Sequence, residues 1–159
     1  MTLPLLTPLP PETLRAEGVP APFAFGHADR VRFSDLDALD HVNNARYLSW
    51  FETFRIAYLR AYGLGDYGSA DRPLLVLKQV GVDYHAPLHL EQTYVVAGRT
   101  RAFRRTSFTM EYGVWSGGAL RATSHAILCL MEPDFRTRRP LPDGWVAAFG
   151  DRDGATRDV

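Results

Sequence analysis

The segment between Asn43 and Gly63 constrains the fold more than any other part of the chain. An aromatic stripe follows the i, i+3, i+4, i+7 and i+11 positions of one helix face: Tyr47, Trp50, Phe51, Phe54 and Tyr58. Other faces of the same segment are also apolar, through Leu48, Ile56, Leu59 and Tyr62. A helix that is apolar most of the way round is buried by the rest of the chain. The sequence therefore predicts a central helix that ends near the glycines of "YGLG".

Strand-like segments supply the surrounding layer. "FGHADRVRF" (25–33) precedes the helix, and four more segments follow it: "LLVLKQVGVDY" (74–84), "TYVVAGRTRAF" (93–103), "RTSFTMEYGVW" (105–115) and "ALRATSHAILCLM" (119–131). Their apolar residues alternate or run continuously, as in strands. We predict an α+β domain in which the last four strands form an antiparallel meander and the whole sheet curls around the helix.

The two ends of the chain differ in composition from the middle. A length of 159 residues suits one domain. Residues 1–22 hold six of the eleven prolines, which predicts an extended arm. Residues 147–159 are polar, which predicts a flexible tail. The expected domain is therefore residues 23–146.

Charge and cysteine content exclude several classes of partner. Eighteen basic residues balance eighteen acidic ones, so the chain has no overall field for nucleic acid or a membrane surface. No apolar run approaches the ~20 residues of a membrane span. The single cysteine, Cys129, cannot form an intrachain disulfide and suits a reducing compartment. We expect a cytoplasmic protein with no nucleic-acid partner and no membrane insertion.

Familiar short motifs fail on their context. "GLGDYG" (63–68) has the spacing of a dinucleotide fingerprint, but it follows a helix instead of a strand. "DLDAL" (35–39) resembles a phosphoryl-transfer pair without the alternating strands and helices that such a fold needs. His85 and His89 flank a proline, so the helical spacing of metal ligands is not available to them. We expect no metal and no cofactor.

The stretch "VRFSDLDALDHVNNARYLSWF" (31–51) places three aspartates, a histidine and two asparagines directly before the predicted helix. Asp and Asn are common capping residues, and spacing alone favours capping by Asn43 or Asn44. The alternative is a reactive site, in which a carboxylate lies beside the unpaired amides of a helix start.

The segment "SDLDALDHVNNARYLSWFETFR" (34–55) resembles the signature of the 4-hydroxybenzoyl-CoA thioesterase type of the hotdog-fold superfamily. Three later segments are similar to the strands and closing segment of that family: "VGVDYHAPLHLEQTYVV", "RRTSFTMEYGVW" and "ATSHAILCLMEPDFRTRRPLP". The resemblance covers roughly residues 24–146. It implies a hotdog fold, hydrolysis of acyl-CoA thioesters, and homodimers or homotetramers formed by sheet pairing.

Residue by residue, the resemblance makes Asp37 the catalytic carboxylate and Asp35 a support for the turn. Asp40 stands where relatives commonly have glycine; it either raises the pKa of Asp37 through like-charge repulsion or points to solvent. Asn44 stands where some relatives have histidine, so no second general base is expected there. His41 either orients the turn or substrate or makes a structural hydrogen bond.

Thioester hydrolysis needs an attacking group and donors for the developing oxyanion. Asp37 is either the nucleophile or the general base that activates water. The backbone amides of Asn44 or Ala45, at the positive end of the helix dipole, are the expected donors. Tyr47 either lines the acyl pocket or packs in the core.

Arginines are expected to take the phosphates of coenzyme A, because the guanidinium group matches phosphate geometry. One cluster comprises Arg101, Arg104 and Arg105, and another comprises Arg136, Arg138 and Arg139. A solvated surface is the alternative for both. Glu52 and Arg55, one helical turn apart, are expected to pair. The acyl group stays open, and so do two alternatives: an acyl carrier protein substrate and a non-catalytic acyl-CoA-binding protein.

Overall fold

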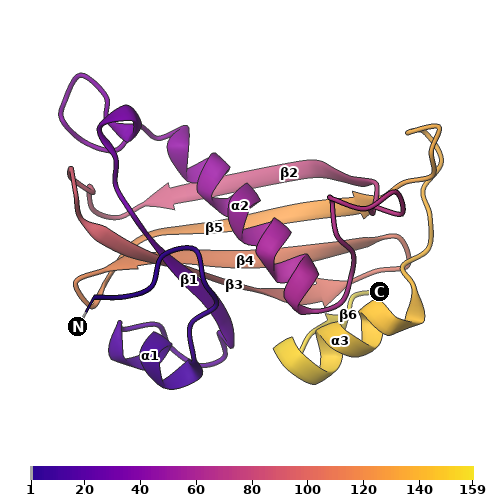
Figure 1. The fold of residues 1–159 in the computed structure, drawn as a ribbon. Helices are drawn as coiled ribbons and strands as arrows, with labels where there is room; N and C mark the ends of the chain where they lie inside the picture. Colours follow the sequence, from indigo (N-terminus) through magenta and orange to yellow (C-terminus); the bar gives the residue numbers. More distant parts are fainter. Residues whose placement is uncertain (1) are drawn as a thin grey trace.

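The computed structural model describes residues 2–159 and has the predicted α+β architecture (Figure 1). Its main elements are strand β1 (Phe25–Arg30), helix α2 (Arg46–Ala61), and strands β2 (Leu75–Tyr84), β3 (Thr93–Phe103), β4 (Ser107–Ser116) and β5 (Ala119–Leu130). The shorter elements are helix α1 (Pro11–Ala16), the 3-10 turn η1 (Phe33–Asp35), helix α3 (Asp143–Asp153) and strand β6 (Thr156–Arg157).

The strand order of the sheet is β1-β3-β4-β5-β2, with antiparallel pairs throughout, and β6 adds a short parallel pair to β3. Strands β3, β4 and β5 form the predicted meander. The prediction was wrong for β2, which pairs with β5 and not with its neighbour in sequence, β3. In the chain, helix α2 connects β1 to β2. It crosses the sheet, so these two strands lie at opposite edges.

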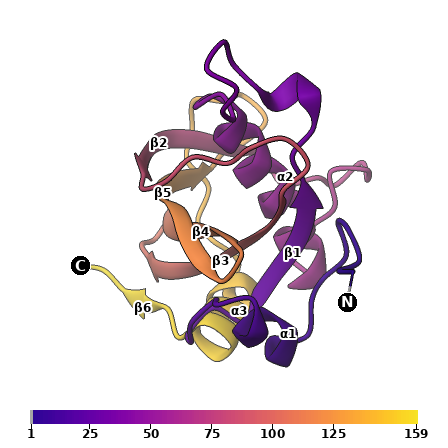
Figure 2. The same ribbon diagram turned by 90° about the vertical axis from the view of Figure 1, so that its left-hand side faces the viewer.

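The sheet curves around α2, as the view along the strands shows (Figure 2). The aromatic stripe is buried as predicted: Phe51, Phe54 and Tyr58 have no exposed surface. Trp50 stacks on Tyr94 with ring centroids 4.0 Å apart, and Phe51 stacks on Tyr112 at 5.0 Å. Such pairs add about 0.5–1.5 kcal/mol each beyond the area that they bury. The helix is therefore fixed against β3 and β4 by specific aromatic contacts.

The N-terminal arm is not merely extended, contrary to the prediction. Residue 1 lies outside the described residues, but α1 forms within the arm, and Leu9, Leu14 and Val19 are buried. They pack in a second cluster with apolar side chains on the sheet face turned away from α2, including Val95 and Trp115. The side chains on that face are apolar, and without the proline-rich segment they would be exposed to solvent.

The C-terminal segment is ordered, and the prediction of a flexible tail was wrong. Helix α3 buries Phe149 completely and leaves Asp153 only 3% exposed. The Asp153 carboxylate accepts hydrogen bonds from the Tyr58 hydroxyl (2.5 Å), the Thr100 amide (2.7 Å) and the Tyr62 hydroxyl. Asp153, one of the polar residues that suggested a tail, is thus satisfied inside the fold. Within residues 2–159, no helix is long and apolar enough to span a membrane.

Candidate active site

Asp35 organises the turn between β1 and α2. Its side chain is 8% exposed, and its Oδ2 accepts a hydrogen bond from the Arg32 amide at 2.8 Å. Oδ1 lies 3.8 Å from Nε of Arg46, the first residue of α2. The Asp35 carbonyl accepts from the Asn43 amide at 2.8 Å. Asp35 therefore ties both ends of the loop together, which agrees with the supporting role expected for it.

Asp37 lies inside this loop with one carboxylate oxygen held and the other available. Oδ1 accepts from the Leu39 amide at 2.8 Å, and the Asp37 amide donates to the His41 carbonyl at 2.8 Å. Oδ2 accepts no hydrogen bond from any described residue. The side chain is half-buried. A fixed carboxylate with a free oxygen can attack a carbonyl carbon or take a proton from water.

Asp40 adopts a left-handed backbone conformation, with φ of +58°. Glycine adopts this conformation without strain, and Asp tolerates it better than most other residues. An aspartate can therefore occupy this position, where the family resemblance leads us to expect glycine. Its side chain is exposed, in line with one of the two alternatives expected for it.

Asn43 forms a turn directly before α2, whose N-cap residue is Ala45, and the contacts of Asn43 decide which amides remain free. Its Oδ1 accepts from the Ala45 amide at 2.9 Å, and its carbonyl accepts from the Arg46 amide at 2.9 Å. The Ala45 amide, one of the two expected oxyanion donors, is therefore occupied. The other, the amide of Asn44, has no hydrogen-bond partner in the described part of the chain. Asn44 is thus the donor that stays available for a substrate oxygen.

Asp37 and the helix start share one cavity of about 300 Å³, whose walls include Asp37, His41, Asn44, Tyr47, Tyr84 and His85. Three regions therefore converge: the acidic loop, the first turn of α2 and the end of β2. From the sequence, His85 was weighed only as a metal ligand, and Tyr84 was not predicted to belong to the site. Both lie in a segment that resembles the family, but no local pattern indicated that this strand end would reach the helix start.

Tyr84 connects the strand end to the helix start. Its hydroxyl donates to the Asn44 carbonyl at 2.8 Å, and its ring lies 5.1 Å from the Tyr47 ring in an edge contact. Tyr47 is 3% exposed, so it packs in the core and also forms part of the cavity wall. Burial raises the pKa of Tyr47 to about 12, which keeps its hydroxyl protonated near neutral pH.

His41 is half-buried beside Asp37 and contacts a second histidine. Its ring centroid lies 5.1 Å from that of His89 in an edge arrangement. His89 belongs to the connection between β2 and β3. The imidazole of His41 is therefore held between the cavity and this connection, a position from which it can orient the loop or a substrate.

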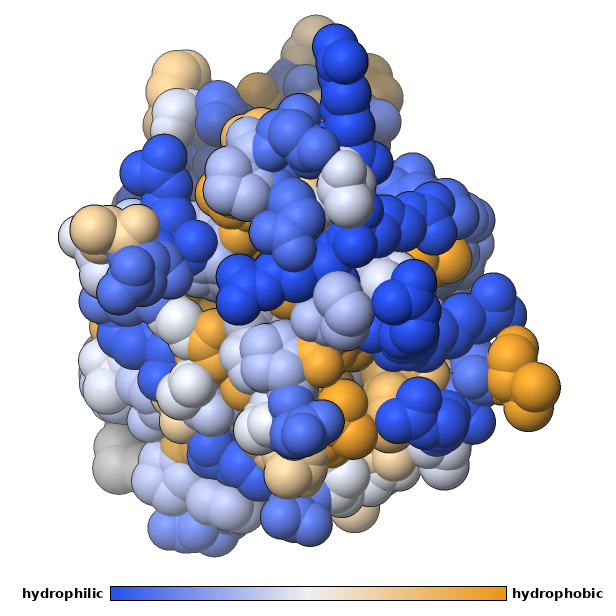
Figure 3. Space-filling view, turned by 90° about the vertical axis from the view of Figure 1, so that its right-hand side faces the viewer, coloured by the Kyte–Doolittle hydropathy of each residue, from blue (hydrophilic) through white to orange (hydrophobic). Residues whose placement is uncertain are grey.

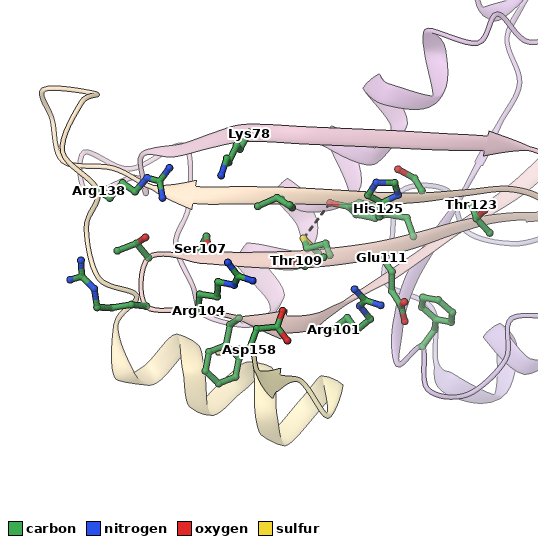
Figure 4. Close-up of a pocket in the computed structure, with 18 of the residues that line it drawn as sticks. Lys78, Arg101, Arg104, Ser107, Thr109, Glu111, Thr123, His125, Arg138 and Asp158 are labelled. Carbon is green, nitrogen blue, oxygen red and sulfur yellow. Dashed lines mark hydrogen bonds between the residues drawn. The ribbon is translucent and has the colours of Figure 1, made fainter.

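The predicted phosphate-binding arginines do not join this site within one chain. Strand β3 begins at Thr93, which pairs with the end of β1 that leads into the acidic loop. The strand ends at Phe103, directly before Arg104, and its two ends are ten residues or roughly 30 Å apart. Figure 4 shows Arg101 and Arg104 with Arg138 and Lys78 around a separate cavity on the sheet.

This second cavity is large and basic. It has a volume of about 890 Å³, and its five cations, Lys78, Arg101, Arg104, Arg105 and Arg138, outnumber its three carboxylates, Asp83, Glu111 and Asp158. Among the described residues, none of these five has a carboxylate within 4 Å. The neighbouring end of the molecule is mostly hydrophilic, with apolar side chains scattered over it (Figure 3). The arginines are therefore free to bind an anion such as phosphate.

Comparisons with known proteins agree on one family. The model of the Thioesterase-like superfamily matches residues 31–149. A thioesterase superfamily protein from Jannaschia sp. CCS1 is 44% identical, with 97% of this chain and 98% of that chain covered and a TM-score of 0.90. A thioesterase from Thermus thermophilus, solved with coenzyme A and Zn, is 33% identical, with 80% and 93% covered and a TM-score of 0.68.

A curated relative extends this agreement. The acyl-CoA thioester hydrolase YbgC of Escherichia coli O6:H1 is 25% identical over 122 residues, which cover 76% of this chain and 91% of that protein. Together the comparisons confirm the predicted hotdog fold and the predicted enzyme class, a thioester hydrolase. The matched residues include the acidic loop, the central helix and strands β2 to β5, and the chain belongs to the thioesterase-like superfamily.

Proposed function

We propose that this protein is an acyl-CoA thioesterase, which hydrolyses an acyl- or aroyl-CoA to the free acid and coenzyme A. One observation carries the proposal: Asp37 and Asn44 line the same cavity, and among the described residues neither Oδ2 of Asp37 nor the Asn44 amide has a hydrogen-bond partner. The relatives support the substrate class, since one is named an acyl-CoA thioester hydrolase and another was solved with coenzyme A.

In the proposed reaction Asp37 supplies the attacking side. Its Oδ2 either adds to the thioester carbon, giving an anhydride that water then cleaves, or removes a proton from a water that adds directly. In both routes the carbon–sulfur bond breaks, and the sulfur leaves as the thiolate of coenzyme A and takes up a proton. Hydrogen bonds from the Leu39 and His41 amides to Oδ1 hold the carboxylate in place.

Asn44 supplies the electrophilic side. Its amide lies at the start of α2, where the helix dipole favours negative charge. A donor of this kind contributes about 3 kcal/mol to the stability of a tetrahedral oxyanion. His41 and Tyr47 complete the cavity wall as orienting groups, whereas Ala45 does not line the cavity and its amide donates to the Asn43 side chain.

The proposal includes a homodimer, or a tetramer built from two such dimers, formed through sheet pairing. Arg101, Arg104 and Arg105 bind the coenzyme A phosphates, which suits their lack of carboxylate partners among the described residues. Antiparallel pairing of two sheets places the far end of one subunit beside the Asp37 end of the other, so these arginines serve the partner's site.

The mechanism uses a carboxylate and amide donors, so it needs neither metal nor cofactor, and coenzyme A is part of the substrate. Activity that survives dialysis against EDTA is the expected result. The lone cysteine, Cys129, is buried and suits the reducing cytoplasm, where acyl-CoA substrates are found.

Two variants with a panel of short, long and aryl coenzyme A thioesters test the function. Asp37→Asn removes the attacking oxygen and should lower kcat at least about a thousandfold. Asp40→Asn is the matched control, because Asp40 is an exposed carboxylate of the same loop and Asn also tolerates positive φ. Wild-type protein that binds but cleaves none of the esters would instead favour a non-catalytic acyl-CoA-binding protein.

The same panel separates coenzyme A from acyl carrier protein as the carrier. Free coenzyme A should compete with the thioester, because the proposed site includes arginines for its phosphates. A site for a carrier protein has no need of those phosphates. Cleavage of acyl carrier protein thioesters that free coenzyme A leaves unchanged would contradict this part of the proposal.

A further inference from the structure

Strand β2 forms an open edge of the sheet. It pairs with β5 on one side, and no strand of the described chain lies on its other side. Val76 and Leu77 are exposed there, at 38% and 41%. An unpaired edge with exposed apolar side chains is a template for a second strand, and an identical strand from another copy can pair with it antiparallel across a two-fold axis.

A hollow of about 290 Å³ opens beside this edge. Its apolar walls are Ile56, Leu75, Leu77 and Leu128, and its polar groups are Glu52, Arg55 and Tyr67. Arg55 is half-buried, whereas Glu52 is exposed. The expected ion pair between them is not formed, since no carboxylate described here lies within 4 Å of Arg55.

The Arg55 guanidinium has donors to spare. Its one hydrogen bond within the described chain goes to the Tyr112 hydroxyl, at 3.4 Å, and Tyr112 is 2% exposed. The guanidinium group has five N–H donors, so most of them remain available to a ligand in the hollow. An apolar hollow with one unpaired cation suits an apolar group that ends in a hydrogen-bond acceptor.

Within one chain the hollow is too far from Asp37 to hold a short acyl group. Arg55 lies nine residues along α2 from Arg46, or about 14 Å. Along β2, Leu75 and Tyr84 are nine residues or about 30 Å apart. Antiparallel pairing over the whole strand removes this separation, because it sets Tyr84 of one copy opposite Leu75 of the other.

We infer that Arg55 of the partner subunit completes the Asp37 site and selects short acyl groups that end in a hydrogen-bond acceptor, a carboxylate or a hydroxyl. This inference rests on the proposed thioesterase function. The thioester lies at Asp37 and Asn44 of one subunit, and the acyl group extends into the hollow of the other. Ile56, Leu75 and Leu77 contact its carbon chain, and Arg55 donates to its end.

Matched esters test the selectivity. Valeryl-, 5-hydroxyvaleryl- and glutaryl-CoA differ only at the last carbon, and benzoyl-, 4-hydroxybenzoyl- and 4-carboxybenzoyl-CoA form the aryl series. Wild-type protein should prefer polar-ended esters in kcat/KM. Arg55→Met should lower kcat/KM for the polar-ended esters at least about tenfold relative to the plain esters of the same series. Arg60→Met, on the same helix but paired with Asp66, is the matched control and should change neither.

Mixed dimers test the shared site. Asp37→Asn and Arg55→Met subunits are mixed in equal amounts, exchanged in mild urea and assayed with the best polar-ended ester. Half of the dimers are then mixed, and each has one site with both native residues, so activity should recover to about a quarter of wild type. If Arg55 acted on Asp37 of its own chain, no site would be intact and activity would not recover.

The outcomes separate the inference from the function on which it rests. Loss of all cleavage in Asp37→Asn together with normal selectivity in Arg55→Met overturns only the role of Arg55. If activity recovers in the mixed dimers but Arg55→Met has the selectivity of wild type, the shared site is supported and the selection of polar-ended acyl groups is overturned. A wild-type protein that is inert toward every ester overturns both the function and the inference.

Discussion

Tyr84 donates a hydrogen bond from its hydroxyl to the main-chain carbonyl of Asn44, 2.8 Å away, and so joins the end of β2 to the start of α2. The carbonyl of Asn44 belongs to the residue whose amide is the proposed oxyanion donor. The hydrogen bond to this carbonyl restricts rotation of the adjoining peptide groups. Tyr84 is therefore a positioning residue in the proposed mechanism.

Tyr84→Phe keeps the ring contact with Tyr47 and removes only the hydrogen bond. We expect kcat to fall about tenfold, because a misplaced oxyanion donor raises the barrier by about 1.4 kcal/mol, while KM and the melting temperature stay near wild type. Tyr62→Phe is the control at the other end of α2: its hydroxyl binds Asp153, so stability should fall and kcat should not. Equal effects of the two variants on kcat would contradict the positioning role.

Asp40 is held at a φ of +58°, which costs free energy for any residue with a Cβ. Asp40→Gly should raise the free energy of unfolding by about 0.5–1 kcal/mol, and Asp40→Val should lower it by about 1–2 kcal/mol. Urea unfolding measures both changes. If both variants lowered the free energy of unfolding by the same amount, the loop would not require this backbone conformation.

The sequence alone predicted the parts of this molecule that depend on local patterns. The stripe from Tyr47 to Tyr58 follows helical periodicity, and the loop around Asp37 carries the family signature, so both were found. The contact of Tyr84 depends instead on a partner 40 residues away, and those of Asp153 on partners 53 to 95 residues away, and no local spacing encodes them. For the same reason the position of β2 at the sheet edge could not be read from segment order.

The tyrosines predict how stability changes at high pH. Burial is the largest cause that raises the pKa of Tyr47 and Tyr112 to about 12, and it raises those of Tyr58, Tyr62 and Tyr94 further. In the unfolded chain these groups ionise at a pKa near 10.0. Their contribution to stability is therefore complete below about pH 10 and is lost as the pH rises through the folded pKa values, because the unfolded state then loses protons first.

Alkaline titration measures this effect. Absorbance at about 295 nm should show little tyrosine ionisation at about pH 10 and a steep rise at higher pH that coincides with loss of circular dichroism. The free energy of urea unfolding should fall steadily as the pH rises from about 10 to about 12. Gradual ionisation of most tyrosines near pH 10, with circular dichroism unchanged, would mean that these side chains are not buried as described.

Asp153 fixes α3 to the central helix, and its removal should affect stability without affecting the active site. Asp153→Ala leaves three buried donors, from Tyr58, Tyr62 and Thr100, without their acceptor, so we expect a loss of about 3 kcal/mol or more in urea unfolding. Asp151→Ala is the matched control: Asp151 is an exposed carboxylate of the same helix, and its loss should change stability by less than about 0.5 kcal/mol. KM for the best ester should stay at the wild-type value in the folded fraction, since Asp153 lies at the opposite end of α2 from Asp37. A fall in activity that exceeds the unfolded fraction would show that α3 also positions the catalytic end of the helix.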